Sequence, residues 1–164
     1  MTEIKAQPPP HPHLNEMSFP DPVQSTRLQL SPGHPIGVTE AMIEELVHGF
    51  YAKVRQDPEL GPIFGVVVSD WGPHLRKMCD FWSSVTLMSG RYHGTPMPVH
   101  ARLDGVGPAQ FGRWLQLFEA TAIEVCPPAA AALFVDRARR IAQSLQMGMA
   151  VARGELPPLH ARAT

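Results

Sequence analysis

The sequence predicts a single all-α domain. Apolar residues recur at the spacing of one helix face over several long stretches after residue 39. Proline and glycine pairs separate these stretches, and we find neither the alternating pattern of a strand nor an internal repeat. We therefore expect long helices that are joined by short connectors and packed as antiparallel neighbours.

Composition and charge narrow the class of protein. The chain has 164 residues, of which 44% are hydrophobic and 18% charged, as suits one globular domain. A net charge of -1 argues against a nucleic-acid partner, and the arginines within 137–140 are interpreted as a solvated helix face. No apolar run is long enough for a membrane span, and the polar N-terminus does not resemble a signal peptide, so we expect a cytoplasmic protein without a membrane partner. Cys79 and Cys126 are too few for a disulfide framework.

Residues 1–37 are expected to form an extended, mostly disordered extension. Proline lacks a backbone donor and breaks helices, and eight prolines occur here: Pro8, Pro9, Pro10, Pro12, Pro20, Pro22, Pro32 and Pro35. The histidines of this stretch (His11, His13 and His34) are interpreted as incidental rather than as a metal site. We place the folded domain at residues 38–153 and a flexible tail at residues 154–164.

The first helix of the domain is predicted to begin after Thr39, a residue type that caps helix N-termini, with Glu40 in its first turn. Its apolar face consists of Ile43, Leu46, Val47, Phe50, Tyr51 and Val54. Pro58 and the pair Gly61–Pro62 are expected to end this helix, because both residue types punctuate helices. A short connector is then expected over residues 63–68.

Asp70 is expected to cap a second helix, whose apolar face consists of Trp71, His74, Met78, Phe81, Trp82, Val85 and Met88. A loop over residues 90–94 follows, and then a short helix or turn over residues 96–103. A third long helix is predicted after Gly107–Pro108, and a last helix over residues 127–153, where proline suits the first turn.

Two histidines are candidates for chemistry. His74 interrupts an apolar helix face, where a buried imidazole costs free energy unless it has a partner. From composition alone, a core histidine bonded to a carbonyl is the favoured interpretation. His100 follows a segment stiffened by Pro96 and Pro98, and imidazole is the commonest metal ligand, including for haem iron. Taken alone, however, His100 is interpreted more simply as a surface histidine.

Tyr51 and Trp114 lie toward the edges of the apolar faces of their helices. Buried tyrosine and tryptophan normally need partners for O–H and N–H, although either alone is explained as a core aromatic. Together with His74, however, they can converge from three helices as donors above a ligand, while a further histidine holds a metal from below. No carboxylate pair, nucleophile elbow or glycine-rich phosphate loop competes with this arrangement.

Several segments resemble the truncated haemoglobins, and their third group in particular. Phe50–Tyr51 and the run Asp57–Phe64 resemble the opening of that family. The third-group pattern is carried by His74–Trp82, Gly90–Gly94 and Pro96–His100, and then by Phe111–Phe118 with Trp114. The resemblance covers residues 39–153 and leaves out the proline-rich extension and the tail.

This resemblance implies a shortened globin fold, with helices packed two-over-two around haem b. It implies that His100 is the proximal iron ligand, and that Tyr51, His74 and Trp114 are distal polar residues. The expected haem-contacting residues are Phe64, Met78, Tyr92, Met97, His100 and Trp114. The second ring nitrogen of His100 is expected to donate to a backbone carbonyl, as iron-bound histidines do.

By the same resemblance, we expect a pentacoordinate iron that binds oxygen, nitric oxide or carbon monoxide, with peroxide as a further ligand. Donors from Tyr51 and Trp114 would bind oxygen tightly, which suits oxygen or nitric-oxide chemistry rather than oxygen transport. Such chemistry needs a reductase as partner. His74 is expected either to gate the pocket or to deliver a proton to a bound peroxide. Two alternative functions stay open: a peroxidase-like haem enzyme and a haem-free helical interaction module.

Overall fold

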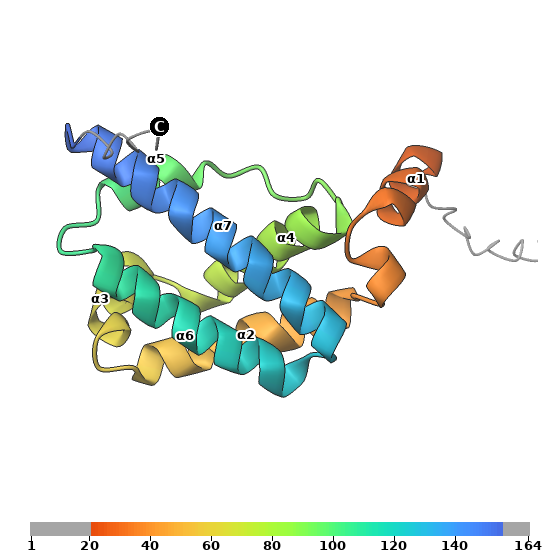
Figure 1. Cartoon of the computed structure of the whole chain (residues 1–164), viewed down its shortest axis with the longest axis horizontal. Helices are drawn as coiled ribbons and strands as arrows, with labels where there is room; N and C mark the ends of the chain where they lie inside the picture. Colours follow the sequence, from red (N-terminus) through yellow and green to blue (C-terminus); the bar gives the residue numbers. More distant parts are fainter. Residues whose placement is uncertain (1–20, 156–164) are drawn as a thin grey trace, which may run out of the picture.

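The computed structural model describes residues 21–155, and every regular element in that range is a helix, as predicted (Figure 1). None of these helices is both long and apolar enough to cross a membrane. Residues 1–20 and 156–164, with most of the expected extension and tail, lie outside the described residues. The elements are α1 (Pro22–Leu30), η1 (His34–Ile36), α2 (Glu40–Gln56), α3 (Leu60–Val67), α4 (Trp71–Leu87), α5 (Pro96–Ala101), α6 (Pro108–Val125) and α7 (Pro128–Ala152).

Four long helices form two pairs, α2 with α4 and α6 with α7. Helix α2 packs on α4 and also on α6, while α6 packs along α7 and α4 contacts α7. In Figure 1, α6 runs beside α2 and α7 crosses α4. The short helices complete the arrangement, with α3 on α2 and α5 on α7. This is the expected two-over-two packing of helices.

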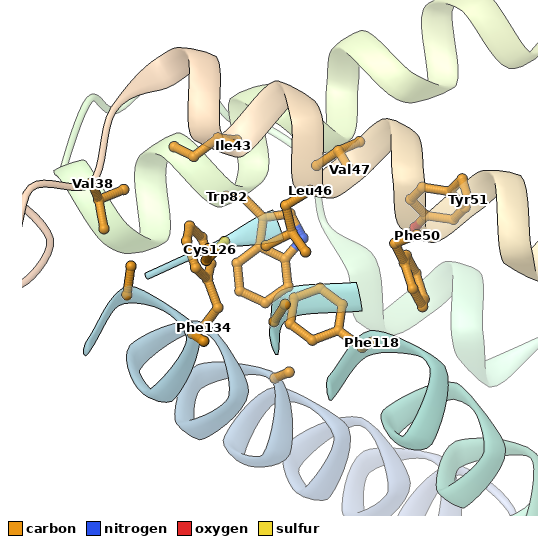
Figure 2. Packing of buried hydrophobic residues seen from close by; sticks show 14 of the residues in the cluster. Val38, Ile43, Leu46, Val47, Phe50, Tyr51, Trp82, Phe118, Cys126 and Phe134 are labelled. Atoms are coloured by element: carbon orange, nitrogen blue, oxygen red, sulfur yellow. The ribbon is translucent and has the colours of Figure 1, made fainter. Parts of the chain in front are cut away.

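An aromatic cluster joins the four long helices in the core. The indole of Trp82 on α4 stacks on Phe118 of α6, with ring centroids 4.8 Å apart, and meets the edge of Phe134 on α7 (Figure 2). Phe50 of α2 meets Phe118 edge-on at 5.2 Å. Burying each such ring stabilises the fold by about 1.5–3 kcal/mol. The cluster therefore holds the side chains that pack on it in fixed positions.

The predicted N-terminal caps of α2 and α4 are confirmed. The Thr39 hydroxyl accepts a hydrogen bond from the backbone N–H of Met42 at 3.2 Å. The Asp70 carboxylate accepts one from the N–H of Gly72 at 3.0 Å. Each side chain satisfies a backbone donor that has no partner within its helix, which is why these residue types mark where helices begin.

Helix α3 occupies the stretch that was expected to be a connector over residues 63–68, so this prediction is wrong. The Asp57 carboxylate accepts the N–H groups of Glu59 and Leu60, both at 3.0 Å, and thereby caps the new helix. Pro62 lies in the first turn of α3, where a helix needs no N–H from it. It is therefore part of a helix start rather than a terminator.

Residues 21–37 also differ from the expected extended chain, because they contain α1 and η1. Asp21 caps α1, and Pro22 occupies its first position. The N–H of Gly33 donates to the Thr86 carbonyl at 2.9 Å, which docks the segment on the end of α4. A Cβ atom at Gly33 would lie 2.7 Å from that oxygen, so the close approach requires glycine. The domain limits themselves stay a prediction.

Candidate haem site

A cavity of about 290 Å³ opens between the two helix pairs. Every helix from α2 to α7 contributes to its lining, which is mainly apolar. Seven residues that the sequence singled out line it together: Tyr51, Phe64, His74, Met78, Tyr92, His100 and Trp114. The fold therefore gathers residues that lie far apart in the chain.

The orientation of His100 is fixed by a hydrogen bond within α5. Its Nδ1 lies 2.7 Å from the carbonyl oxygen of Pro96. A carbonyl can only accept, so Nδ1 carries the proton, and in this tautomer the lone pair of the ring is on Nε2. The expected bond from this ring to a backbone carbonyl is thus present. A neutral imidazole held this way is typical of a histidine that ligates a metal through Nε2.

Tyr51 and His74 lie against each other on another part of the wall. Their rings meet edge-on with centroids 5.1 Å apart, and the Tyr51 ring also meets Phe64 at 5.8 Å. Tyr51 is buried, and burial raises the pKa of its phenol well above the usual value. Its O–H group therefore stays protonated and remains a hydrogen-bond donor at any physiological pH.

His74 has an unsatisfied ring nitrogen. Its Nε2 is buried and has no hydrogen-bond partner within the described residues. The favoured interpretation from composition, a core histidine bonded to a carbonyl, is therefore not what the structure contains. Burial, and to a smaller extent the charge of Lys77, lowers the pKa of His74, so the ring is neutral at neutral pH. A buried polar atom without a partner is costly, which points to a ligand that satisfies it.

Trp114 reaches the cavity from α6. Its indole stacks on Phe118 with centroids 5.4 Å apart and an interplanar angle of 11°. It also meets Phe50 edge-on at 5.3 Å. These contacts with the core fix the plane of the indole at the cavity wall.

Met97 is the one expected haem-contacting residue that does not line this cavity. Its side chain packs directly on the backbone of α7 at Gly148, where a Cβ would collide with it. Because Gly148 lacks a side chain, α5 can approach α7 closely at this point. Met97 thus joins a small apolar cluster beside the cavity, with Val106, Phe111 and Met149.

The residues that the sequence interpretation missed are mostly apolar. They come from α3, from the segment around α5, from the start of α6 and from the C-terminal half of α7, and include Ile63, Val67, Val99, Leu103, Phe111, Ile141 and Leu145. The sequence placed the members on α6 and α7 in ordinary core stripes, and their periodicity gives no signal that separates cavity from core. Lys77, whose Nζ lies 6.0 Å from the Tyr92 ring centroid, supplies the only formal charge in the lining.

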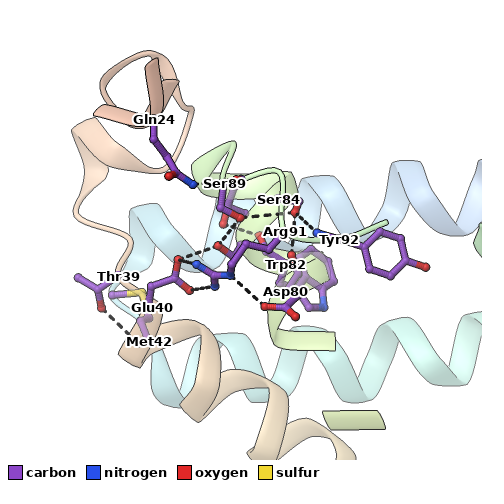
Figure 3. Close-up of polar contacts among 12 residues, drawn as sticks. Gln24, Thr39, Glu40, Met42, Asp80, Trp82, Ser84, Ser89, Arg91 and Tyr92 are labelled. Carbon is purple, nitrogen blue, oxygen red and sulfur yellow. Dashed lines mark hydrogen bonds and ion pairs between the residues drawn. The ribbon is translucent and has the colours of Figure 1, made fainter. Parts of the chain in front are cut away.

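The loop that carries Tyr92 is held by a polar network (Figure 3). Arg91 donates to both oxygens of Glu40, at 3.1 and 2.8 Å, and to Asp80 at 2.9 Å. The N–H of Tyr92 donates to the Ser84 hydroxyl at 3.0 Å. The loop is thus tied to α2 and α4, and Tyr92 is brought to the edge of the cavity.

The donor set limits which metals the cavity can hold. Among residues 21–155, no three or more His, Cys, Asp or Glu side chains come together as a metal site. A bare ion of the zinc type needs about four protein ligands. A metal that brings its own equatorial ligands, as haem iron does, needs only one or two.

The comparisons with known proteins agree with this geometry. No family model matches the chain. The chain is 34% identical over 113 residues to the group 3 truncated haemoglobin of Campylobacter jejuni, which covers 66% of this chain and 89% of that protein. The chain belongs to the truncated haemoglobin family.

Two solved structures are similar to this truncated haemoglobin. The group III truncated haemoglobin of Campylobacter jejuni matches with a TM-score of 0.63 at 32% identity, over 67% of this chain and 90% of that one. The group II truncated haemoglobin of Bacillus anthracis matches with a TM-score of 0.56 at 28% identity, over 70% of this chain and 89% of that one. The shortened globin fold expected from the sequence is thereby confirmed.

Membership in this family implies a haem cofactor and diatomic gas ligands. The residues of this truncated haemoglobin fit such a group on three counts. The cavity is mainly apolar, His100 keeps a lone pair on Nε2, and the buried Nε2 of His74 lacks a partner within residues 21–155. A largely apolar prosthetic group fits the cavity, its metal can bind His100, and a ligand on that metal can form a hydrogen bond with His74.

Proposed function

We propose that the chain is a haem b protein whose iron is held by His100 and whose open iron position binds oxygen, nitric oxide or carbon monoxide. The observation that carries the proposal is the bond from His100 Nδ1 to the Pro96 carbonyl at 2.7 Å, on a residue that lines an apolar cavity. Ferrous haem, when bound, supplies an iron atom with an axial position at which diatomic gases bind.

The distal residues in this proposal are Tyr51, His74 and Trp114. Tyr51 stays protonated, so it donates a hydrogen bond to a ligand that draws negative charge. Trp114 can only donate, whereas neutral His74 can donate or accept through its ring. A hydrogen bond to a charged group contributes about 1.5–3 kcal/mol, which corresponds to an affinity change of about ten- to a hundredfold.

Two donors favour tight binding and slow release of oxygen. Slow release is unsuited to oxygen transport, so we propose oxygen or nitric-oxide chemistry as the biological role. The apolar lining, with Phe64, Met78 and Tyr92 among its members, excludes water from the pocket. A reductase that returns ferric iron to the ferrous state is the partner that such chemistry requires.

Peroxide turnover is a second candidate function, because His74 Nε2 is buried and unpartnered within the described residues. Its lowered pKa leaves the imidazole neutral, so it can exchange a proton with a peroxide substrate. His74→Leu distinguishes the two roles of this residue. Slower peroxide turnover indicates the proton role, while a change confined to ligand association indicates a gate.

The first experiment is the absorption spectrum of the full-length protein, ferric, reduced with dithionite and then exposed to carbon monoxide. We expect a Soret band that shifts on reduction and shifts again with carbon monoxide. The variant His100→Ala should retain little haem, whereas His48→Ala, which removes an exposed histidine of α2, should retain it fully. Absence of a Soret band in the wild type, even after haemin is added, would contradict the proposal and favour a haem-free interaction module.

A further inference from the structure

Trp71 lies behind the distal wall of the cavity without lining it. Its ring meets His74 edge-on at 5.6 Å and lies 5.9 Å from the Tyr51 ring, measured between centroids. His74 and Tyr51 themselves line the cavity, and Trp71 does not. Trp71 therefore forms a second layer, which touches both polar residues of the wall.

Trp71 is partly exposed to solvent, and an arginine of α2 lies on its outer side. Trp71 is the first residue of α4, directly after the capping residue Asp70. The guanidinium of Arg55, an exposed residue of α2, lies over its ring with Cζ 4.8 Å from the centroid. This distance is within the range of a cation–π interaction, which links the surface of α2 to the start of α4.

The layering constrains how His74 can move. Its Nε2 is buried, and its ring is flanked by Tyr51 on one side and Trp71 on another. We propose that Trp71, held by Arg55, is the outer cover of the distal pocket, and that Trp71 must move before a small ligand passes between the pocket and solvent beside His74. The identity of that ligand rests on the proposed function, but the cover itself does not.

A cover has a kinetic signature that differs from that of a hydrogen-bond donor. It raises the barrier for association and dissociation equally, so removing it accelerates both rates and leaves the dissociation constant unchanged. Loss of a donor that stabilises the bound ligand mainly accelerates dissociation and weakens affinity. The two effects can therefore be separated on the same protein.

The test measures carbon monoxide association by flash photolysis, and carbon monoxide dissociation by replacement, on the haem-loaded full chain. We expect Trp71→Ala to accelerate both rates by about tenfold and Arg55→Met by about threefold, the latter corresponding to one exposed cation–π interaction. Trp71→Phe keeps an aromatic ring between His74 and solvent and should restore most of the wild-type rates. Arg139→Gln, which removes an exposed arginine that pairs with Glu119 on the surface, is the control and should change neither rate.

Unchanged rates in Trp71→Ala and Arg55→Met would overturn the inference and place ligand access on the side of Lys77 and Tyr92. A change in affinity without equal changes in both rates would also overturn it, because Trp71 would then act on the bound ligand. Circular dichroism checks that each variant is folded. If Trp71→Ala does not fold, Arg55→Met decides the question.

A second measurement does not depend on haem. Deuterium exchange at the imidazole C2 position of His74, followed by mass spectrometry on the haem-free full chain, reports the access of solvent to this ring. We expect slow exchange in the wild type and exchange several-fold faster in Trp71→Ala, with the exposed His48 as an internal reference. Equal rates at His74 would overturn the inference even if the protein bound no haem, whereas missing haem with a protected His74 would contradict only the proposed function.

Discussion

At the scale of single residues, burial determines what Tyr51 can do. The side chain is 6% exposed, and burial keeps the pKa of its phenol far above neutral pH. The group is therefore a permanent donor rather than a charge that varies with pH. Its neighbours Phe64 and His74 pack edge-on against the ring and leave it little freedom to turn.

We predict that Tyr51→Phe accelerates oxygen release by about tenfold or more, which is the loss of one hydrogen bond to a charged ligand. The measurement is the oxygen dissociation rate of the ferrous protein by stopped flow. Thr121→Val is the matched control, because it removes a buried hydroxyl of α6 that bonds to the Leu117 carbonyl and does not line the cavity. An unchanged release rate in Tyr51→Phe would remove Tyr51 from the distal site.

Residue identities were the most predictable part of the site. His74 and His100 were candidates from their apolar or proline-rich surroundings, but only the resemblance to the truncated haemoglobins assigned them to a site. Both line the cavity. The sequence could not show that Met97 lies outside the cavity lining. Its place depends on Gly148, which is distant in the chain and leaves room for the Met97 side chain on α7. The role of Trp71 was also hidden, since the sequence places it on the apolar face of α4 and gives no sign that Arg55 covers it.

At the scale of elements, Asp57 joins three helices. It follows α2 directly, caps α3 through the N–H groups of Glu59 and Leu60, and receives Arg113 of α6 at 2.7 Å. The bond from the Leu60 N–H, together with the Arg113 guanidinium, holds the pKa of this carboxyl below its usual value. The charged form is therefore favoured by the fold.

The pH dependence of stability follows from that shift. A carboxyl whose folded pKa is lowered contributes stability that is present above the unfolded value, near 3.8, and is lost as pH falls through the lower folded value. We predict that Asp57→Asn lowers Tm by several degrees at neutral pH. The difference should shrink as the pH falls below about 4, where the unfolded chain takes up the proton of Asp57 first, and should vanish once the pH passes the lower folded pKa. Thermal unfolding at a series of pH values measures this.

Asp136→Asn is the control for Asp57→Asn. Asp136 pairs with Arg140 on the exposed surface of α7, and exposed pairs of this kind contribute little to stability. Its Tm should follow that of the wild type at each pH. A constant difference in Tm between Asp57→Asn and wild type across the acid range would mean that the charge of Asp57 does not stabilise α3.

The start of α3 also explains why this helix was not predicted. Pro58 and Gly61–Pro62 are local helix breakers, and their position suggested an end rather than a beginning. The same carboxylate that caps α3 also receives Arg113 of α6, a contact that a local pattern does not reveal. Helix α1 gave no signal for another reason: it has no buried residue, so no apolar periodicity marks it. The long helices were predictable because each buries one continuous face.

At the scale of the whole molecule, the described residues form two apolar clusters of different size, and members of both line the cavity. The larger cluster joins α2, α4, α6 and α7 through Phe50, Trp82, Phe118 and Phe134. The smaller one joins the ends of α6 and α7 to the segment after α5, through residues such as Phe111 and Leu145. A haem bound in the cavity would contact both clusters and would add most to the smaller one.

This division predicts where the cofactor stabilises the molecule. A ligand that binds only the folded state stabilises it by mass action, and it protects most strongly the segments that contact it. We predict that adding haemin to the haem-free full chain slows amide hydrogen exchange in α5 and in the C-terminal half of α7 by about tenfold or more, with little local change in the α2–α6 core. Exchange followed by mass spectrometry measures each segment.

His100→Ala is the control and should show no slowing in α5 at the same haemin concentration, because α5 then lacks the iron ligand. Equal protection in wild type and His100→Ala would mean that haemin binds without His100. Protection spread evenly over all helices would contradict the division into two clusters.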